Sequence, residues 1–145
     1  MLTILTDTRE QRPYTFRQYS DVKTESATLR TGDYSIAGFQ DKITIERKSL
    51  TDLFGSCGSG RKRFEAEFKR MAGYDVAGLV IESDFLDVFR TPPKYTKMNP
   101  KSVYRTVLAW SVRYGVHVWW GHNREMSEKI VYIVLSGWGK DNVGN

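Results

Sequence analysis

The chain has 145 residues, and 40% of them are hydrophobic, which is enough to close one core but not two. Its 22 Lys and Arg residues exceed its 17 Asp and Glu residues, and the resulting net charge of +5 favours a polyanionic partner. The only cysteine, Cys57, excludes an internal disulfide and a cysteine-cluster zinc site, while two histidines, His117 and His122, leave little for histidine-based catalysis or metal binding. Carboxylates and lysines are therefore the expected carriers of any chemistry.

The N-terminal residues MLTILTDTRE lack a basic segment and a long apolar segment, and the sequence has no run of 18 apolar residues. These features predict a cytoplasmic protein with no membrane contact. The length predicts a single domain over residues 1–145, without accessory modules.

The first third of the chain predicts strands. Leu2–Leu5 is a short apolar run that would end near Asp7. Residues 18–30 and Tyr34–Ala37 flank the turn sequence TGD and predict a hairpin. Lys42–Lys48 alternates with a period of two, which places Glu46 and Lys48 on one face of a strand and Arg47 on the other.

Helices and strands then alternate along the chain. Helices are predicted from Ser49 through Phe54, from Arg61 to Gly73, from Asn99 to Gly115 and from Asn123 to Gly139, with Ser49, Asn99 and Asn123 as N-caps. Strands are predicted at Val76–Ile81, parallel to its neighbours, and at Val116–Trp120, with a flexible loop at residues 55–60 and an irregular basic segment at residues 90–101. The pattern is typical of an α/β fold, a mixed sheet of five or six strands with helices on its faces.

Two carboxylates and one lysine fall on neighbouring predicted strands. Asp33 precedes one strand, and Glu46 and Lys48 share a face of the next. Two carboxylate oxygens with water and phosphate oxygens suit a hard cation such as Mg²⁺. An adjacent ammonium can orient or help deprotonate a metal-bound water and neutralise charge on a phosphoryl oxygen. The sequence thus predicts phosphodiester cleavage.

These residues also belong to a longer pattern. Residues 32–34 (GDY), 46–49 (ERKS) and 52–53 (DL) resemble the GDY…ERKS…DL signature of XPF-type nucleases, a branch of the PD-(D/E)XK superfamily with a restriction-endonuclease-like fold. Residues 7–10 (DTRE) resemble the upstream D-x-R-E element of this family. The dipeptide GR at residue 60 and the run LVIE at residue 79 also occur where the family places them, so the resemblance covers roughly residues 3 to 84. Glu65 is the nearest equivalent of a glutamine that often follows GR.

The resemblance implies an endonuclease that depends on Mg²⁺, with Mn²⁺ able to substitute, and that cuts DNA near flaps, forks or junctions in repair, recombination or replication. It implies a homodimer and no nucleotide cofactor. By carry-over, Asp33, Glu46 and Asp7 would bind the metal and Lys48 would activate water. The family pattern also implies catalytic roles for Arg47, as the central residue of the ERK motif, and for Glu10, as a further acid beside the metal.

Structural roles remain alternatives for these residues. Asp33 could be a turn residue, Glu46 and Lys48 a solvated pair, and Arg47 a guard of the strand end. Asp7 and Glu10 could be ordinary loop acids, and a capping role accounts fully for Asp52.

Two basic segments are candidates for DNA binding. Arg61, Lys62 and Arg63 lie at a helix start, where positive charge opposes the helix dipole, so they either grip phosphates or form a solvated face. Lys94, Tyr95 and Lys97 could form a DNA-facing loop in which Tyr95 stacks on an unpaired base. Arg9 could steady the nearby acids or bind a phosphate.

Two other functions remain open. The first is a catalytically silent DNA-binding or scaffold module, although such a module is expected to lose the acids or the lysine, which are present here. The second is a sequence-specific restriction-like nuclease. The apolar last two helices and Trp138 indicate burial against a second copy, and the compact chain would suit a phage or mobile-element genome.

Overall fold

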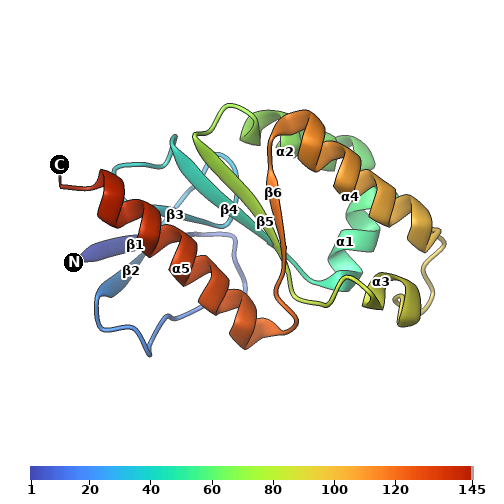
Figure 1. Ribbon diagram of the computed structural model, residues 1–145, viewed down its shortest axis with the longest axis horizontal. Helices are drawn as coiled ribbons and strands as arrows, with labels where there is room; N and C mark the ends of the chain where they lie inside the picture. Colours follow the sequence, from blue (N-terminus) through green and yellow to red (C-terminus); the bar gives the residue numbers. More distant parts are fainter. Residues whose placement is uncertain (145) are drawn as a thin grey trace.

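The computed structural model describes residues 1–144, which form one six-stranded mixed sheet with helices on both faces (Figure 1). The strands are β1 (Leu2–Asp7), β2 (Val22–Ala27), β3 (Tyr34–Ile36), β4 (Ile43–Lys48), β5 (Val76–Ile81) and β6 (His117–Trp120). The helices are α1 (Leu50–Cys57), α2 (Arg61–Met71), α3 (Asp87–Arg90), α4 (Pro100–Tyr114) and α5 (Arg124–Asn142). The predicted fold class is confirmed. Asn145, the end of the predicted domain, lies outside the described residues.

The strand order is β2-β1-β3-β4-β5-β6. Strand β3 is antiparallel to both of its neighbours, and all other pairs are parallel. The predicted parallel pairing of β5 is therefore confirmed. Strands β3 and β4 lie at the centre of the sheet, and the chain segments that follow β1 and β4 lie near each other at one end of it.

Each face of the sheet has its own apolar core. Helix α5 covers one face, where Val131 and Leu135 pack in a cluster with Ile4, Ile43 and Ile45. Helices α1, α2 and α4 cover the other face with a cluster that includes Phe54, Phe68, Leu79, Val107 and Trp110. The alternation of β4 follows from these two cores, because its isoleucines face α5 while its polar side chains at 46 and 48 face α1 and α2.

Side-chain caps set the starts of three helices at the predicted residues. Ser49 accepts a hydrogen bond from the backbone N–H of Asp52 at 3.1 Å, and Asn99 accepts one from Lys101 at 2.8 Å. Asn123 caps α5 in the same way. Each cap pairs an N–H group that has no partner within its own helix.

Two predictions of local structure are wrong. Strand β2 does not form a hairpin with β3 but pairs in parallel with β1, with Leu2 opposite Val22 and Asp7 opposite Ala27. The mostly exposed side chains of β2 suit an edge of the sheet, whereas β1, whose Ile4 is fully buried, lies between β2 and β3. Helix α1 also continues to Cys57, because that side chain is buried against the core, so residues 55–57 are helical rather than a flexible loop.

No helix among residues 1–144 is both long enough and apolar enough to cross a membrane.

Candidate active site

The turn before β3 fixes the position of Asp33. Its backbone N–H donates to the carbonyl of Ile45 at 2.8 Å, and its Oδ2 accepts from the backbone N–H of Arg47 at 2.8 Å. Gly32 has φ of +85°, and a Cβ there would lie 1.9 Å from Oγ1 of Thr44. Only glycine permits this approach of the turn to β4, so the backbone itself holds the Asp33 carboxylate against the end of β4.

The structure brings Asp33, Glu46 and Lys48 together. Glu46 is only 8% exposed, and its carboxyl group hydrogen-bonds to that of Asp33. The ammonium Nζ of Lys48 lies 3.3 Å from Oε2 of Glu46 and packs over the ring of Phe64. The strand alternation seen in the sequence therefore delivers these side chains to one place.

A third carboxylate, which the sequence analysis missed, joins them from α2. The carboxyl group of Glu67 hydrogen-bonds to that of Glu46. Glu67 follows Phe64 by three residues and precedes the buried Phe68, so it borders the apolar face of the helix. That spacing is the signal that could have found it. By contrast, Glu65 points to α4, where it accepts from the Tyr114 hydroxyl at 2.7 Å.

The three carboxyl groups outnumber the one ammonium among them. Burial, with lesser contributions from the charges of Glu10 and Glu67, raises the pKa of Asp33 to about 6, although the hydrogen bond from the backbone of Arg47 opposes the shift. Burial and the neighbouring Asp33 and Glu67 raise the pKa of Glu46 well above its ordinary value, and burial also raises that of Glu67. For Lys48, burial opposes the charged form, but the carboxylates of Glu46 and Glu67 outweigh it and raise its pKa. Within residues 1–144, Lys48 forms the only ion pair with these carboxyl groups, and Arg9 and Arg70 act on them more weakly, so the cluster is short of closely placed positive charge.

This shortage fits a divalent cation. Paired oxygen donors at a buried position are the ligands that Mg²⁺ prefers, with water and phosphate oxygens completing the set. Within residues 1–144, no three His, Cys, Asp or Glu side chains are grouped so that they could hold a metal by themselves. A site with two protein carboxylates, Asp33 and Glu46, is therefore the arrangement that these residues support.

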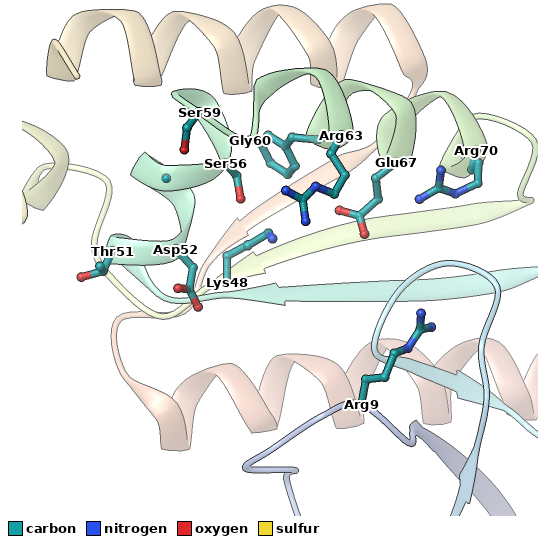
Figure 2. Close-up of a pocket in the computed structure, with 12 residues that line it drawn as sticks. Arg9, Lys48, Thr51, Asp52, Ser56, Ser59, Gly60, Arg63, Glu67 and Arg70 are labelled. Atoms are coloured by element: carbon teal, nitrogen blue, oxygen red, sulfur yellow. The ribbon is translucent and has the colours of Figure 1, made fainter. Parts of the chain in front are cut away.

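A pocket of about 650 Å³ opens beside Lys48, between α1, α2 and the segment after β1 (Figure 2). Lys48, Arg63 and Glu67 point into it (Figure 2). Arg9 and Arg70 also line it, and they donate hydrogen bonds to Leu29 and Thr31 of one loop. Arg9, Arg63 and Arg70 thus bring three guanidinium groups to the pocket. Such cations bind phosphate oxygens without regard to base sequence.

Asp7, a predicted metal ligand, is occupied by other partners. Its Oδ2 accepts from Nε of Arg9 at 2.8 Å, and its Oδ1 accepts from the backbone N–H of Leu29 at 2.9 Å. Burial would raise the pKa of Asp7, but these hydrogen bonds and the charge of Arg9 lower it. Asp7 therefore positions Arg9. The charges of Asp33 and Glu46 add to the effect of Asp7 in raising the pKa of Arg9.

Arg47 and Glu10 lie on the opposite side of β4 from Lys48. Arg47 pairs with Glu82 through Nε and lies 3.3 Å from Oε2 of Glu10 through Nη1. Its guanidinium also packs 4.5 Å from the ring centroid of Tyr14, whose hydroxyl donates to Glu82 at 2.6 Å. Glu10 accepts from the Tyr34 hydroxyl at 3.1 Å. The side chain of Arg47 is thus held in a network of ion pairs and ring contacts, while its backbone N–H holds Asp33.

The tyrosines and Glu82 of this network did not appear among the predicted site residues. Arg124 of α5 packs on the other side of Tyr14, with its guanidinium carbon 4.9 Å from the ring centroid. Burial raises the pKa of Tyr14 and of Tyr34, so both hydroxyls remain hydrogen-bond donors. The network anchors the segment after β1 to β4 and β5.

The basic residues at the start of α2 have different surroundings. Arg61 packs over Trp110 at 4.7 Å and donates to Oγ1 of Thr106 at 2.8 Å, so it fastens α2 to α4. Lys62 is exposed, and Arg63 lines the pocket beside Lys48. Of the three basic residues at the start of α2, Arg63 therefore has the position best suited to binding DNA.

Lys94, Tyr95 and Lys97 lie in an exposed segment between α3 and α4, where they line a second pocket. Asp52 is exposed near the start of α1 and lines the pocket beside Lys48 as well as a smaller one beside Arg47. Cys57 is buried, and burial raises the pKa of its thiol to about 11. His122 pairs with Asp84 at the surface, away from these residues.

The ERCC4 domain family matches residues 6–134 of the chain. The fold is similar to that of XPF from Aeropyrum pernix, with a TM-score of 0.70 and 20% sequence identity over 99% of this chain and 62% of that one. It is also similar to XPF from Aeropyrum pernix in complex with DNA, with a TM-score of 0.74 and 20% identity over 100% of this chain and 68% of that one. This chain thus spans about 62% of the length of the first of these structures. A sequence comparison with curated proteins gives no match.

Proposed function

The chain belongs to the ERCC4 domain family and carries an XPF-type nuclease domain, and on this premise we propose that it is a metal-dependent DNA endonuclease that cuts near branches or single/double-strand junctions. The observation that carries the proposal is the cluster of Asp33, Glu46 and Glu67 beside Lys48, in a pocket lined by arginines. A role in DNA repair, recombination or replication follows from this activity.

Asp33 and Glu46 would hold the ion, because they are the two carboxylates fixed by the sheet backbone. Mg²⁺ is the expected ion, and Mn²⁺ should substitute for it because it accepts the same oxygen ligands. When bound, the ion would supply Lewis-acid activation of a water and would neutralise charge on the phosphoryl group. Hydrolysis would join the water oxygen to phosphorus, break the P–O3′ bond and pass a proton to the leaving oxygen.

The chain's own cations would act on the phosphate. Lys48 holds its proton at Nζ and can donate a hydrogen bond to the phosphoryl oxygen that gains charge. Arg63 and Arg70, on α2, and Arg9, across the pocket, would bind neighbouring phosphates and keep the strand in line. Glu67 is a positioning residue, since its hydrogen bond to Glu46 orients that carboxyl group.

The Lys48→Ala variant tests this assignment. Cleavage of a labelled flap or fork in Mg²⁺ should fall by at least about a hundredfold, which is typical for loss of one donor to a developing negative charge. DNA binding in EDTA should change little, because the arginines remain. Lys42→Ala is the matched control, because Lys42 is an exposed lysine directly before β4. This variant should cleave normally.

Unchanged cleavage by Lys48→Ala would remove Lys48 from the mechanism. A panel of flap, fork, four-way junction, nicked and linear DNA, each with Mg²⁺ and with EDTA, tests the substrate class. Cleavage of linear duplex at one sequence alone would favour a restriction-like enzyme. DNA binding without any cleavage would favour a silent module.

We also propose a homodimer formed by the edge of the sheet that carries β6. Apolar side chains are exposed on the helices on either side of it, with Val112 of α4 85% exposed and Ile133 of α5 56% exposed. The sequence predicted that Trp138 would be buried against a second copy. Its ring instead packs against Phe39 of the same chain, with 5.3 Å between the ring centroids. Sedimentation should show a dimer that Val112→Glu weakens, and a strict monomer at high concentration would contradict the proposal.

A further inference from the structure

A second pocket, of about 530 Å³, adjoins the one beside Lys48. Its walls are α1, the loop after it and the segment of residues 93–98. Thr51, Gly55 and Ser59 line both pockets. In Figure 2, Thr51 lies on the side of α1 away from Glu67, and Ser59 lies in the loop after this helix, so α1 and that loop form the partition between the two spaces. Because the two pockets share these lining residues, a strand held beside Lys48 can reach the second pocket by passing over α1.

The two pockets differ in chemistry. The one beside Lys48 is lined mainly by charged side chains, whereas the second has an apolar lining to which Phe54, Pro93 and Met98 contribute. Its only charged lining residues are Lys94 and Lys97. An apolar slot rimmed by cations complements a flat base attached to a phosphate, because the base loses water-exposed surface while the phosphate meets the ammonium groups.

The form of the pocket depends on a close contact at Gly58. A Cβ at this residue would lie 3.0 Å from Cγ of Met98. The end of α1 and the segment of residues 93–98 therefore approach each other closely and enclose the apolar slot. Gly55 has open space around its Cα, which leaves room above the helix for a ligand.

Tyr95 stands at the rim of this pocket. Its side chain is 99% exposed, and its backbone has a positive φ of 66°, which is costly for a residue other than glycine, asparagine or aspartate. Within residues 1–144, no hydrogen bond or ring contact holds the side chain of Tyr95. A fully solvated aromatic ring beside two lysines is suited to stacking on a nucleobase, as in proteins that bind single strands.

We propose that this pocket binds an unpaired nucleobase of the substrate strand, a few nucleotides from the scissile phosphate, with Tyr95 stacking on it and Lys94 and Lys97 on its phosphate. A base within a duplex is stacked on its neighbours and cannot enter. The pocket therefore gives the nuclease a requirement for at least one unpaired nucleotide beside the cut. This inference rests on the proposed function, because it assigns the base to the strand that is cleaved.

The test uses the full chain and fluorescently labelled DNA in EDTA, so that binding is measured without cleavage. Tyr95→Ala should weaken binding to a flap by about fivefold to a hundredfold, the range for loss of one base–aromatic stack. Its affinity for a blunt duplex of equal length should change less than twofold. Tyr95→Phe should restore flap binding, because the ring is what stacks.

A scan of the DNA locates the base. An abasic site is placed in turn at each of the first four unpaired positions of the flap. One position should weaken binding by wild type to the same extent as Tyr95→Ala, and it should have no further effect in that variant. Lys97→Ala should weaken flap binding and reduce its salt dependence, whereas Lys129→Ala, an exposed lysine on α5, should not.

Equal losses for flap and duplex in Tyr95→Ala, or abasic sites without effect at every position, would overturn the pocket assignment. Failure of the proposed nuclease activity is distinguishable, because it would appear as absence of cleavage in Mg²⁺ while this binding pattern in EDTA persisted.

Discussion

The two sides of the end of β4 carry charge in opposite ways. On one side, Arg47 faces Glu10 and Glu82, and Arg124 adds a second cation across the Tyr14 ring, so positive and negative groups balance. On the other side, three carboxyl groups share one ion-paired ammonium, that of Lys48, with weaker charge effects from Arg9 and Arg70. Arg47 and Lys48, which are adjacent in β4, thus lie in charge environments of different kinds. The balanced side anchors the segment after β1 to β4 and β5, while on the proposed function the other side would bind a divalent cation.

The largest effect should come from breaking the balanced side. Arg47→Met keeps most of the side-chain length but leaves Glu10 and Glu82 without their cation. Because the three side chains are 14–15% exposed, the free energy of unfolding should fall by about 3 kcal/mol, as for a buried ion pair that loses one partner. Urea denaturation measures the change.

Arg30→Met is the control for this variant, since Arg30 is exposed, and it should change the free energy of unfolding by less than about 0.5 kcal/mol. If both variants lowered the free energy of unfolding by similar amounts, the network around Arg47 would not stabilise the fold more than an exposed arginine does.

A smaller effect is expected when the missing cation is added. Saturating Mg²⁺ should raise the free energy of unfolding of the wild type by about 1–3 kcal/mol relative to EDTA at equal ionic strength, because the ion binds only the folded arrangement. Glu46→Gln should abolish this increment. Glu82→Gln, on the balanced side, should destabilise the protein but keep the increment.

An equal Mg²⁺ response in the Glu46 and Glu82 variants would contradict the difference between the two sides. Denaturation curves in Mg²⁺ and in EDTA supply the readout without any measurement of activity.

The smallest effect should come from relieving the unbalanced side. Glu67→Gln removes a carboxyl group whose burial disfavours its charge and which opposes the ionisation of Asp33 and Glu46, so in EDTA the free energy of unfolding should rise by about 0.5–1 kcal/mol. Glu65→Gln, two residues earlier on α2, should instead lower it slightly, because Glu65 pairs with Tyr114 and Arg113. Shifts of the same sign in both variants would count against the charge argument.

Local sequence patterns predicted those parts of the molecule that local physics decides. The alternation at residues 43–48 assigned faces correctly because both faces of β4 are buried against different cores. The caps at Ser49, Asn99 and Asn123 were predictable because each acts on residues two or three positions away. The meeting of Asp33 with Glu46 followed from the predicted proximity of two strands.

Long-range pairing was harder to predict. A turn sequence before β3 favoured a hairpin, yet β2 instead joins β1, which is separated from it by the segment that carries Tyr14. The same limit explains why Glu82 and Tyr14 were missed as partners of Arg47, since 68 positions separate Tyr14 from Glu82. Glu67 was closer to detection, because its place beside a buried helix face is visible in the sequence.

The partition formed by α1 sets the reach of this domain along its substrate. An α-helix with its side chains is about 10–12 Å across, and a stacked strand advances about 3.4 Å per nucleotide. The spaces on its two sides are therefore separated by roughly three nucleotides. On the proposed binding mode, the domain would contact only the few nucleotides next to the cut, so we expect its cleavage to depend on whether those nucleotides are unpaired more than on the angle between the arms of a branch.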